Sequence, residues 1–78
     1  MIQLKYFGAI AEETKSKGEE FPFMEMTLHQ LMENLEQKYP LKKLSFSIAV
    51  NQKIIQNKES YSIKNNDIIA LLPPFAGG

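Results

Sequence analysis

The sequence predicts a small α+β domain in which a mixed β-sheet packs on one main helix. Three observations predict this class: apolar and polar residues alternate at the N-terminus, an amphipathic helical pattern fills the middle, and an apolar run of strand length lies near the C-terminus. The expected order is strand, short helix, strand, long helix, hairpin and final strand. A chain of 78 residues has room for one such domain with a modest core, and not for two.

The N-terminal segment is expected to form a half-buried strand. Residues 2–6 alternate apolar and polar side chains with period two, which is typical of a strand with one face on a core. The apolar members would share the buried face: Ile2, Leu4 and Tyr6. Phe7 has the opposite parity and is expected on the other face.

A short helix and an edge strand are expected next. Residues 9–17 follow Gly8 and have acidic residues early and lysines late, an order that suits the helix dipole. Gly18 is expected to end this helix. Residues 19–24 should then form a strand at a sheet edge, because Pro22 cannot donate a ladder hydrogen bond.

The central helix has the strongest local signals in the chain. Thr27 is a favourable N-cap, and Gln30 three residues later completes a capping box. Apolar residues recur at helical spacing over 28–39, so one face must be buried: Leu28, Leu31, Met32, Leu35 and Tyr39. Pro40 is expected to end the helix.

The C-terminal half is expected to form a hairpin and a central strand. Residues 47–50 and 53–56 pair around a two-residue turn at 51–52, and residues 65–67 form a tight turn. Residues 68–72 are apolar on both faces, which usually marks a central strand covered on both sides. Because only one long helix is available as a cover, either the short elements bend round the second face or that face awaits a partner.

The composition excludes several classes of protein. Nine Lys and Arg residues balance nine Asp and Glu residues, which argues against a nucleic-acid binder because such a protein needs a basic patch. No apolar run approaches ~18 residues, and the N-terminus reads as a strand rather than a signal peptide, so no membrane association is expected. Cysteine is absent, which excludes a disulfide-stapled secreted domain and makes the cytoplasm the expected location.

The chain offers few side chains that could perform catalysis by themselves. There is no cysteine nucleophile, and His29 is the single histidine and cannot build a zinc site alone. The four glycines stand at positions 8, 18, 77 and 78, so they form no phosphate-binding loop. If the protein takes part in chemistry, another protein is expected to supply the catalytic side chains.

Residues 73–78 are expected to form an extended tail. Prolines at 73 and 74 fix φ and hold the exit from the last strand near polyproline II, and the two terminal glycines make a slim tip. The tail spans roughly 20 Å when extended, which is long enough to enter a pocket of another protein. Its ionised carboxylate repels nucleophiles, but joining it to AMP gives an acyl phosphate anhydride that a sulfur or nitrogen nucleophile can attack.

The most specific motif of the chain is its ending, Leu-Leu-Pro-Pro-Phe-Ala-Gly-Gly at 71–78. Further characteristic segments lie along the chain: 4–8, the helix opened by Thr27, 49–52 and 66–67. Through these segments the whole chain resembles the family of molybdopterin synthase small subunits, which are sulfur carriers with the ubiquitin-like β-grasp fold. Two positions depart from the usual pattern, since Gln52 and Asn66 stand where glycine is common.

The resemblance implies a division of the chain and a role for its end. Residues 1–72 would form the β-grasp domain, and residues 73–78 a flexible tail that ends in the reactive carboxylate of Gly78, with Gly77 beside it. An E1-like adenylating enzyme that uses ATP-Mg would adenylate Gly78, and a sulfur-relay protein would help convert it to a thiocarboxylate. The tail would then donate sulfur to a pterin precursor in molybdopterin (molybdenum cofactor) biosynthesis. The chain itself would bind no cofactor.

The resemblance also implies a partner, the large subunit of molybdopterin synthase. This subunit would hold the catalytic side chains and form a heterotetramer of two small and two large subunits. It would contact a patch on the exposed sheet face and part of the tail: Phe7, Ile54, Leu72, Pro73, Pro74, Phe75 and Ala76. Strand parity supports part of this set, because Ile69 and Leu71 should meet the helix while Leu72 should face away. In the hairpin, Ile54 and Ile55 compete for the inward position.

Two other classes of function stay open from the sequence. A sulfur carrier for thiazole synthesis or tRNA thiolation, or a ubiquitin-like protein modifier, would have the same kind of tail and differ in its partner. A β-grasp binding module with no reaction at its end would lose little on removal of Gly77 and Gly78.

Overall fold

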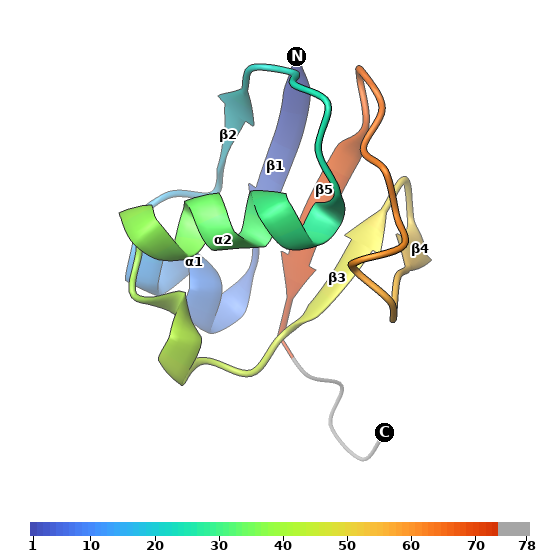
Figure 1. The fold of residues 1–78 in the computed structure, drawn as a ribbon. Coiled ribbons are helices and arrows are strands. Elements are labelled where there is room, and N and C mark those ends of the chain that lie inside the picture. The colour runs from blue at the N-terminus through green and yellow to red at the C-terminus, as the bar shows by residue number, and fades with distance from the viewer. Residues whose placement is uncertain (74–78) are drawn as a thin grey trace.

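The structure is a computed structural model that describes residues 1–73. Its five strands form one mixed sheet, and helix α2 lies across one face of that sheet (Figure 1). The elements are, in chain order, β1 (Ile2–Tyr6), α1 (Gly8–Thr14), β2 (Gly18–Phe21), α2 (Leu28–Lys38), the 3₁₀ helix η1 (Leu41–Lys43), β3 (Ser47–Val50), β4 (Lys53–Ile54) and β5 (Ile68–Leu72). This architecture confirms the α+β class that the sequence predicts.

The sheet has the strand order β2-β1-β5-β3-β4. β1 and β5 pair in parallel at the centre, and all other neighbouring strands are antiparallel. β5 therefore has a strand on each side, as the predicted central strand should. β2 is an edge strand, also as predicted, but it does not reach residue 24 as expected. It ends at Phe21, directly before Pro22, which cannot donate a ladder hydrogen bond.

The hydrophobic core lies between α2 and one face of the sheet, called here the inner face. The apolar stripe of α2 is buried at Leu28, Leu31, Met32 and Leu35 as predicted, whereas Tyr39 is the C-cap and is only half-buried. The predicted capping box is complete: Thr27 Oγ1 accepts from Gln30 N at 3.2 Å, and Gln30 Oε1 accepts from Thr27 N at 2.9 Å. The largest fully buried side chains come from both strands and helices: Tyr6, Ile2, Ile10, Leu28, Leu31, Leu35, Leu41, Ile69 and Leu71. The opposite face of the sheet is called the outer face.

The short N-terminal helix differs from the prediction. α1 spans Gly8–Thr14 and ends where Lys15 adopts a left-handed conformation with φ 58°, so Gly18 does not end it. Gly18 opens β2 instead, and a Cβ added there would lie 2.3 Å from the carbonyl oxygen of Leu4. The close approach of two strands, rather than helix termination, therefore requires glycine at this position.

Asp67 links two turns by hydrogen bonds at the end of the sheet where β5 begins. One is the β3–β4 turn at 51–52, and the other is the turn at 65–67 that leads into β5. The β3–β4 turn uses positive φ at both of its residues, 49° and 72°, a geometry favoured in two-residue hairpins. Asn51 Nδ2 donates to Asp67 Oδ1 at 2.9 Å, and Ile68 N donates to Asn51 Oδ1 at 3.0 Å. Tyr61 Oη and Lys64 N donate to Asp67 Oδ2 at 3.0 and 2.9 Å. Burial alone would raise the pKa of Asp67, but these hydrogen bonds outweigh it and lower the pKa below its ordinary value.

Candidate functional site

Strand parity separates the two faces of the sheet as the sequence predicts. Ile69 and Leu71 are fully buried on the inner face, whereas Leu72 is half-buried on the outer face. In the hairpin, the choice that the sequence left open is resolved by the structure. Ile54 is 46% exposed, and Ile55 packs against the core.

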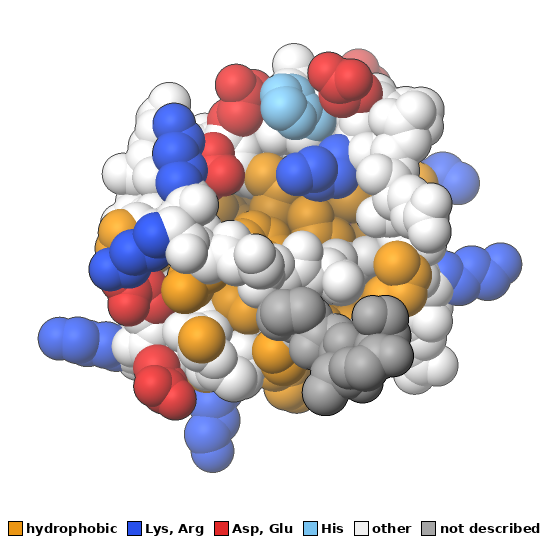
Figure 2. Space-filling view, turned by 90° about the horizontal axis from the view of Figure 1, so that it is seen from below, with side chains coloured by type: hydrophobic (Ala, Val, Ile, Leu, Met, Phe, Trp, Pro, Cys, Tyr) orange, Lys and Arg blue, Asp and Glu red, His pale blue; other side chains and the backbone are white. Residues whose placement is uncertain are grey.

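Apolar side chains gather on the outer face from β4, from β5 and from the residue after β1. They are Phe7, Ile54, Ile68, Ala70 and Leu72, and we call them the outer patch. They line a shallow hollow of about 570 Å³. The surface is hollowed in its middle because two small side chains, Ala49 and Ala70, are paired there across β3 and β5. Figure 2 views the molecule from the end where the chain leaves β5, so it sees the sheet edge-on and shows hydrophobic side chains at this end with most charged ones toward the outline.

Sequence reasoning named part of this surface and missed part of it. Phe7 and Ile54 are large exposed hydrophobic side chains, as the resemblance implies, and Ile68 is a third that was not named, at 39% exposed. Strand parity places Ile68 on the same face of β5 as Leu72, although the predicted contact set did not include it. Lys5 also lines the hollow and is the single charged residue among the described residues that line it. The hollow is therefore mainly apolar, with one cation and the polar side chains of Asn51 and Gln52 in its lining.

The chain leaves the sheet beside the outer patch. β5 ends at Leu72, and the exposed Pro73 is the last described residue. Phe7 N donates to Leu71 O at 3.2 Å, which extends the pairing of β1 with β5 by one hydrogen bond. Gly8 has φ 58°, and a Cβ added there would lie 3.2 Å from Pro73 Cγ. The exit of the tail is thus placed against the junction of β1 and α1.

Five predicted site residues lie outside the described residues: Pro74, Phe75, Ala76, Gly77 and Gly78. The prediction of an extended, flexible tail lies outside them as well.

Within residues 1–73, no group of three or more His, Cys, Asp and Glu side chains is placed to hold a metal ion. His29 projects from α2 with its side chain 44% exposed, 3.9 Å from Glu33. Over the same range, no helix is long and apolar enough to cross a bilayer.

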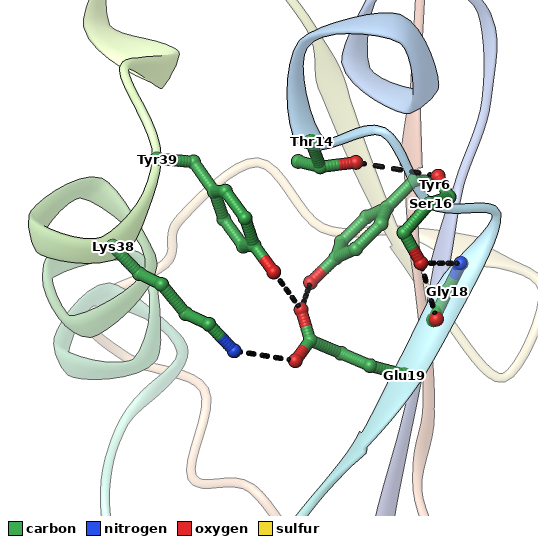
Figure 3. A network of polar contacts seen from close by, with 7 residues as sticks. All are labelled: Tyr6, Thr14, Ser16, Gly18, Glu19, Lys38 and Tyr39. Carbon is green, nitrogen blue, oxygen red and sulfur yellow. Dashed lines mark hydrogen bonds and ion pairs between the residues drawn. The ribbon is translucent and has the colours of Figure 1, made fainter.

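Among the described residues, Tyr6 has the most strongly perturbed pKa, and it belongs to a cluster away from the outer patch, where β2 meets the end of α2 (Figure 3). Tyr6 Oη and Tyr39 Oη donate to Glu19 Oε2 at 2.7 and 2.8 Å, and Lys38 Nζ donates to Glu19 Oε1 at 2.8 Å. Burial, followed by the hydrogen bond to Glu19, raises the pKa of Tyr6 well above its ordinary value. Burial alone would raise the pKa of Glu19, but hydrogen bonds from Lys38 and the two tyrosines lower it instead. The cluster joins an edge strand to the main helix, so its role is structural.

The Glu19→Gln substitution is expected to lower the free energy of unfolding by about 1–2 kcal/mol at pH 7, because charge-assisted hydrogen bonds become neutral ones. The folded-state pKa of Glu19 lies below the unfolded value of about 4.3, so its stabilising effect is present above that pH and is lost as the pH falls through the folded pKa. Urea unfolding at several pH values checks this. The variant should show a flatter pH dependence than the wild type, and the exposed neighbour Glu20→Gln should not. An unchanged midpoint at pH 7 for Glu19→Gln would contradict the expectation.

The fold defines the class of protein. A parallel pair of terminal strands at the centre of a five-stranded mixed sheet, crossed by one main helix, is a ubiquitin-like β-grasp domain. The crystal structure of SAMP1 from Haloferax volcanii shares this fold with a TM-score of 0.79 at 19% identity, over 99% of this chain and 98% of that chain.

Residues 4–78 match the ThiS family, and the chain belongs to this family. It is 34% identical over 62 residues to the molybdopterin synthase sulfur carrier subunit of Dictyostelium discoideum, which covers 76% of this chain and 72% of that relative. It is also similar to a chain in the solved complex of subunits 1 and 2 of the molybdopterin-converting factor from Helicobacter pylori 26695. That likeness has 30% identity and a TM-score of 0.70 over 99% of this chain and 97% of the other.

Proposed function

We propose that this chain is the sulfur-carrier small subunit of a molybdopterin synthase. The observation that carries the proposal is its 34% identity over 62 residues to a relative of that name. The similar chain from Helicobacter pylori was solved in a complex of subunits 1 and 2, which supports a large-subunit partner for this chain. On its own the chain is not an enzyme, in keeping with its small set of reactive side chains. As a carrier passed between enzymes, it is expected in the cytoplasm.

The proposed carrier step takes place at Gly78. Its carboxylate attacks the α-phosphorus of ATP-Mg held by an E1-like adenylating enzyme, and pyrophosphate leaves. Hydrosulfide delivered by a sulfur-relay protein then attacks the carbonyl carbon of the acyl-adenylate, and AMP leaves. The absence of Cβ atoms at Gly77 and Gly78 keeps that carbon accessible in a narrow channel. The resulting thiocarboxylate donates its sulfur to a pterin precursor on the large subunit.

The outer patch is the proposed docking surface for the large subunit. An apolar surface left open on a small domain is what a stable interface requires. Phe7 and Leu72 lie beside the exit of the tail, so a partner that covers them is also placed to receive residues 73–76. Two small and two large subunits would then bring two loaded tails, one for each sulfur of the product.

Mass spectrometry of the intact chain tests this function. When the chain is produced together with its adenylating enzyme and a sulfur donor, its mass should rise by one oxygen-to-sulfur exchange. The loaded chain should then convert a pterin precursor when the large subunit is added. If the intact C-terminus never gains sulfur beside an adenylating enzyme that is active on a known carrier, the proposal is wrong.

The same measurements separate the alternative functions. A carrier for thiazole synthesis or tRNA thiolation would gain sulfur but would not convert the pterin precursor. A protein modifier would form an isopeptide bond with a lysine, and a binding module would gain no sulfur. The two relatives compared above at 30% identity or more are both molybdopterin proteins, which favours the first function.

A further inference from the structure

Gly8 lies where β1 turns into α1, with φ 58°. Glycine takes this left-handed conformation without strain, whereas a Cβ crowds the following carbonyl oxygen. The conformation alone does not explain glycine here, because Lys15 adopts the same φ of 58° at the other end of the same helix. A second property of glycine, the empty space in place of a side chain, must therefore be considered.

The ring of Pro73 borders this empty space. A Cβ added at Gly8 would lie 3.2 Å from Pro73 Cγ, 3.4 Å from its Cβ and 3.7 Å from its Cδ. The first distance is shorter than an ordinary van der Waals contact, so one of the two segments would have to shift. Pro73 is also the residue at which the tail leaves the sheet, because β5 ends at Leu72.

Both sides of this contact are held by the central strand pair. Tyr6 pairs with Leu71 in the parallel register, and Phe7 N donates to Leu71 O at 3.2 Å. Gly8 lies two residues after Tyr6 along the chain, and Pro73 lies two residues after Leu71. A side chain at Gly8 would therefore displace Pro73 more readily than it would displace the paired strands behind it.

We propose that Gly8 is a positioning residue, which sets the direction of the tail through its contact with Pro73. The inference rests on the proposed function, because it concerns how the reactive carbonyl of Gly78 reaches other proteins. Five residues separate Pro73 from the end of the chain, a reach of roughly 17 Å when extended. A shift of Pro73 moves the point from which the tail starts, and misplacement of a reacting atom by about 1 Å can lower a rate by about 100-fold.

The Gly8→Ala variant tests this positioning role. It should lower the kcat for loading by the adenylating enzyme and for sulfur transfer with the large subunit by about tenfold or more. The matched control is Lys15→Ala, which also places alanine at φ 58° but lies at the far end of α1. The control should transfer sulfur at the wild-type rate. Binding of the large subunit through the outer patch should change little in the Gly8→Ala domain, because that patch is intact, and any loss of affinity should come from the contacts of the tail.

A double variant identifies the contact that is responsible. Pro73→Ala removes the ring atoms nearest to the added Cβ, so Gly8→Ala combined with Pro73→Ala should be no slower than Pro73→Ala alone. If Gly8→Ala proves unfolded, Gly8→Asn replaces it, because asparagine tolerates positive φ. The proposal is overturned if the folded Gly8 variant transfers sulfur as fast as the wild type, or if the two substitutions simply multiply in their effects. Failure of the proposed function would look different, since the wild-type chain itself would then gain no sulfur.

Discussion

Removal of Gly77 and Gly78 is expected to abolish sulfur loading and transfer while leaving the domain folded. Among residues 1–73, the last strand ends at Leu72 and the buried core cluster extends no further than Leu71. The free energy of unfolding should therefore change by no more than ~0.5 kcal/mol. The new C-terminal carboxylate would stand on Ala76, roughly 7 Å short of its normal reach and beside a Cβ. No carboxyl carbon would then arrive where adenylation takes place.

Two measurements on the truncated chain check this prediction. Urea unfolding should superimpose on that of the wild type, and mass spectrometry after exposure to the adenylating enzyme should show no gain of sulfur. Gly78→Ala keeps the length of the tail and adds one Cβ, whereas deletion of Gly78 alone keeps a glycine end and shortens the tail. Deletion of Gly78 therefore tests whether loading needs the full length of the tail, and Gly78→Ala tests whether it needs a terminal carbonyl with no Cβ beside it. A truncated chain that still acquires sulfur would show that the terminal glycines are not the carrier site.

Local sequence patterns predicted the elements whose cause is local. The period-two alternation of β1 and the capping box of Thr27 both depend on residues a few positions apart, and both are confirmed. The parity of β5 likewise predicted which of its side chains face the core. The same parity placed Leu72 on the outer face, and hence predicted that this face is apolar.

Predictions failed where the cause lies between segments distant in the sequence. Gly18 has the appearance of a helix terminator, but the carbonyl oxygen of Leu4 on the neighbouring strand is what excludes a side chain there. Lys15 ends the helix in a conformation that no local pattern of lysines and glutamates indicates. The choice between Ile54 and Ile55 was resolved by the pairing of Ile54 with Ala49 across the hairpin. These contacts follow from strand order, which one sequence does not display.

The Ile54→Asp substitution is expected to weaken binding of the large subunit at least about 100-fold, without unfolding the domain. Ile54 is 46% exposed in the free chain, so a carboxylate at this position stays hydrated and its effect on stability should be small. In the proposed complex the same side chain is covered by an apolar partner surface. Removal of a carboxylate from water without a paired cation costs several kcal/mol, and each 1.4 kcal/mol is a factor of ten in affinity.

The control for this prediction is Met24→Asp. Met24 is 53% exposed and borders side chains of α2, on the opposite side of the sheet from the outer patch. The two variants introduce the same charge at similarly exposed apolar positions, so they differ mainly in location. Titration calorimetry with the large subunit should show weakened binding for Ile54→Asp alone, while loading of Gly78 by the adenylating enzyme reports that both variants are folded carriers. Equal affinity for the two variants would mean that the large subunit docks elsewhere, and that the apolar outer face serves a different contact.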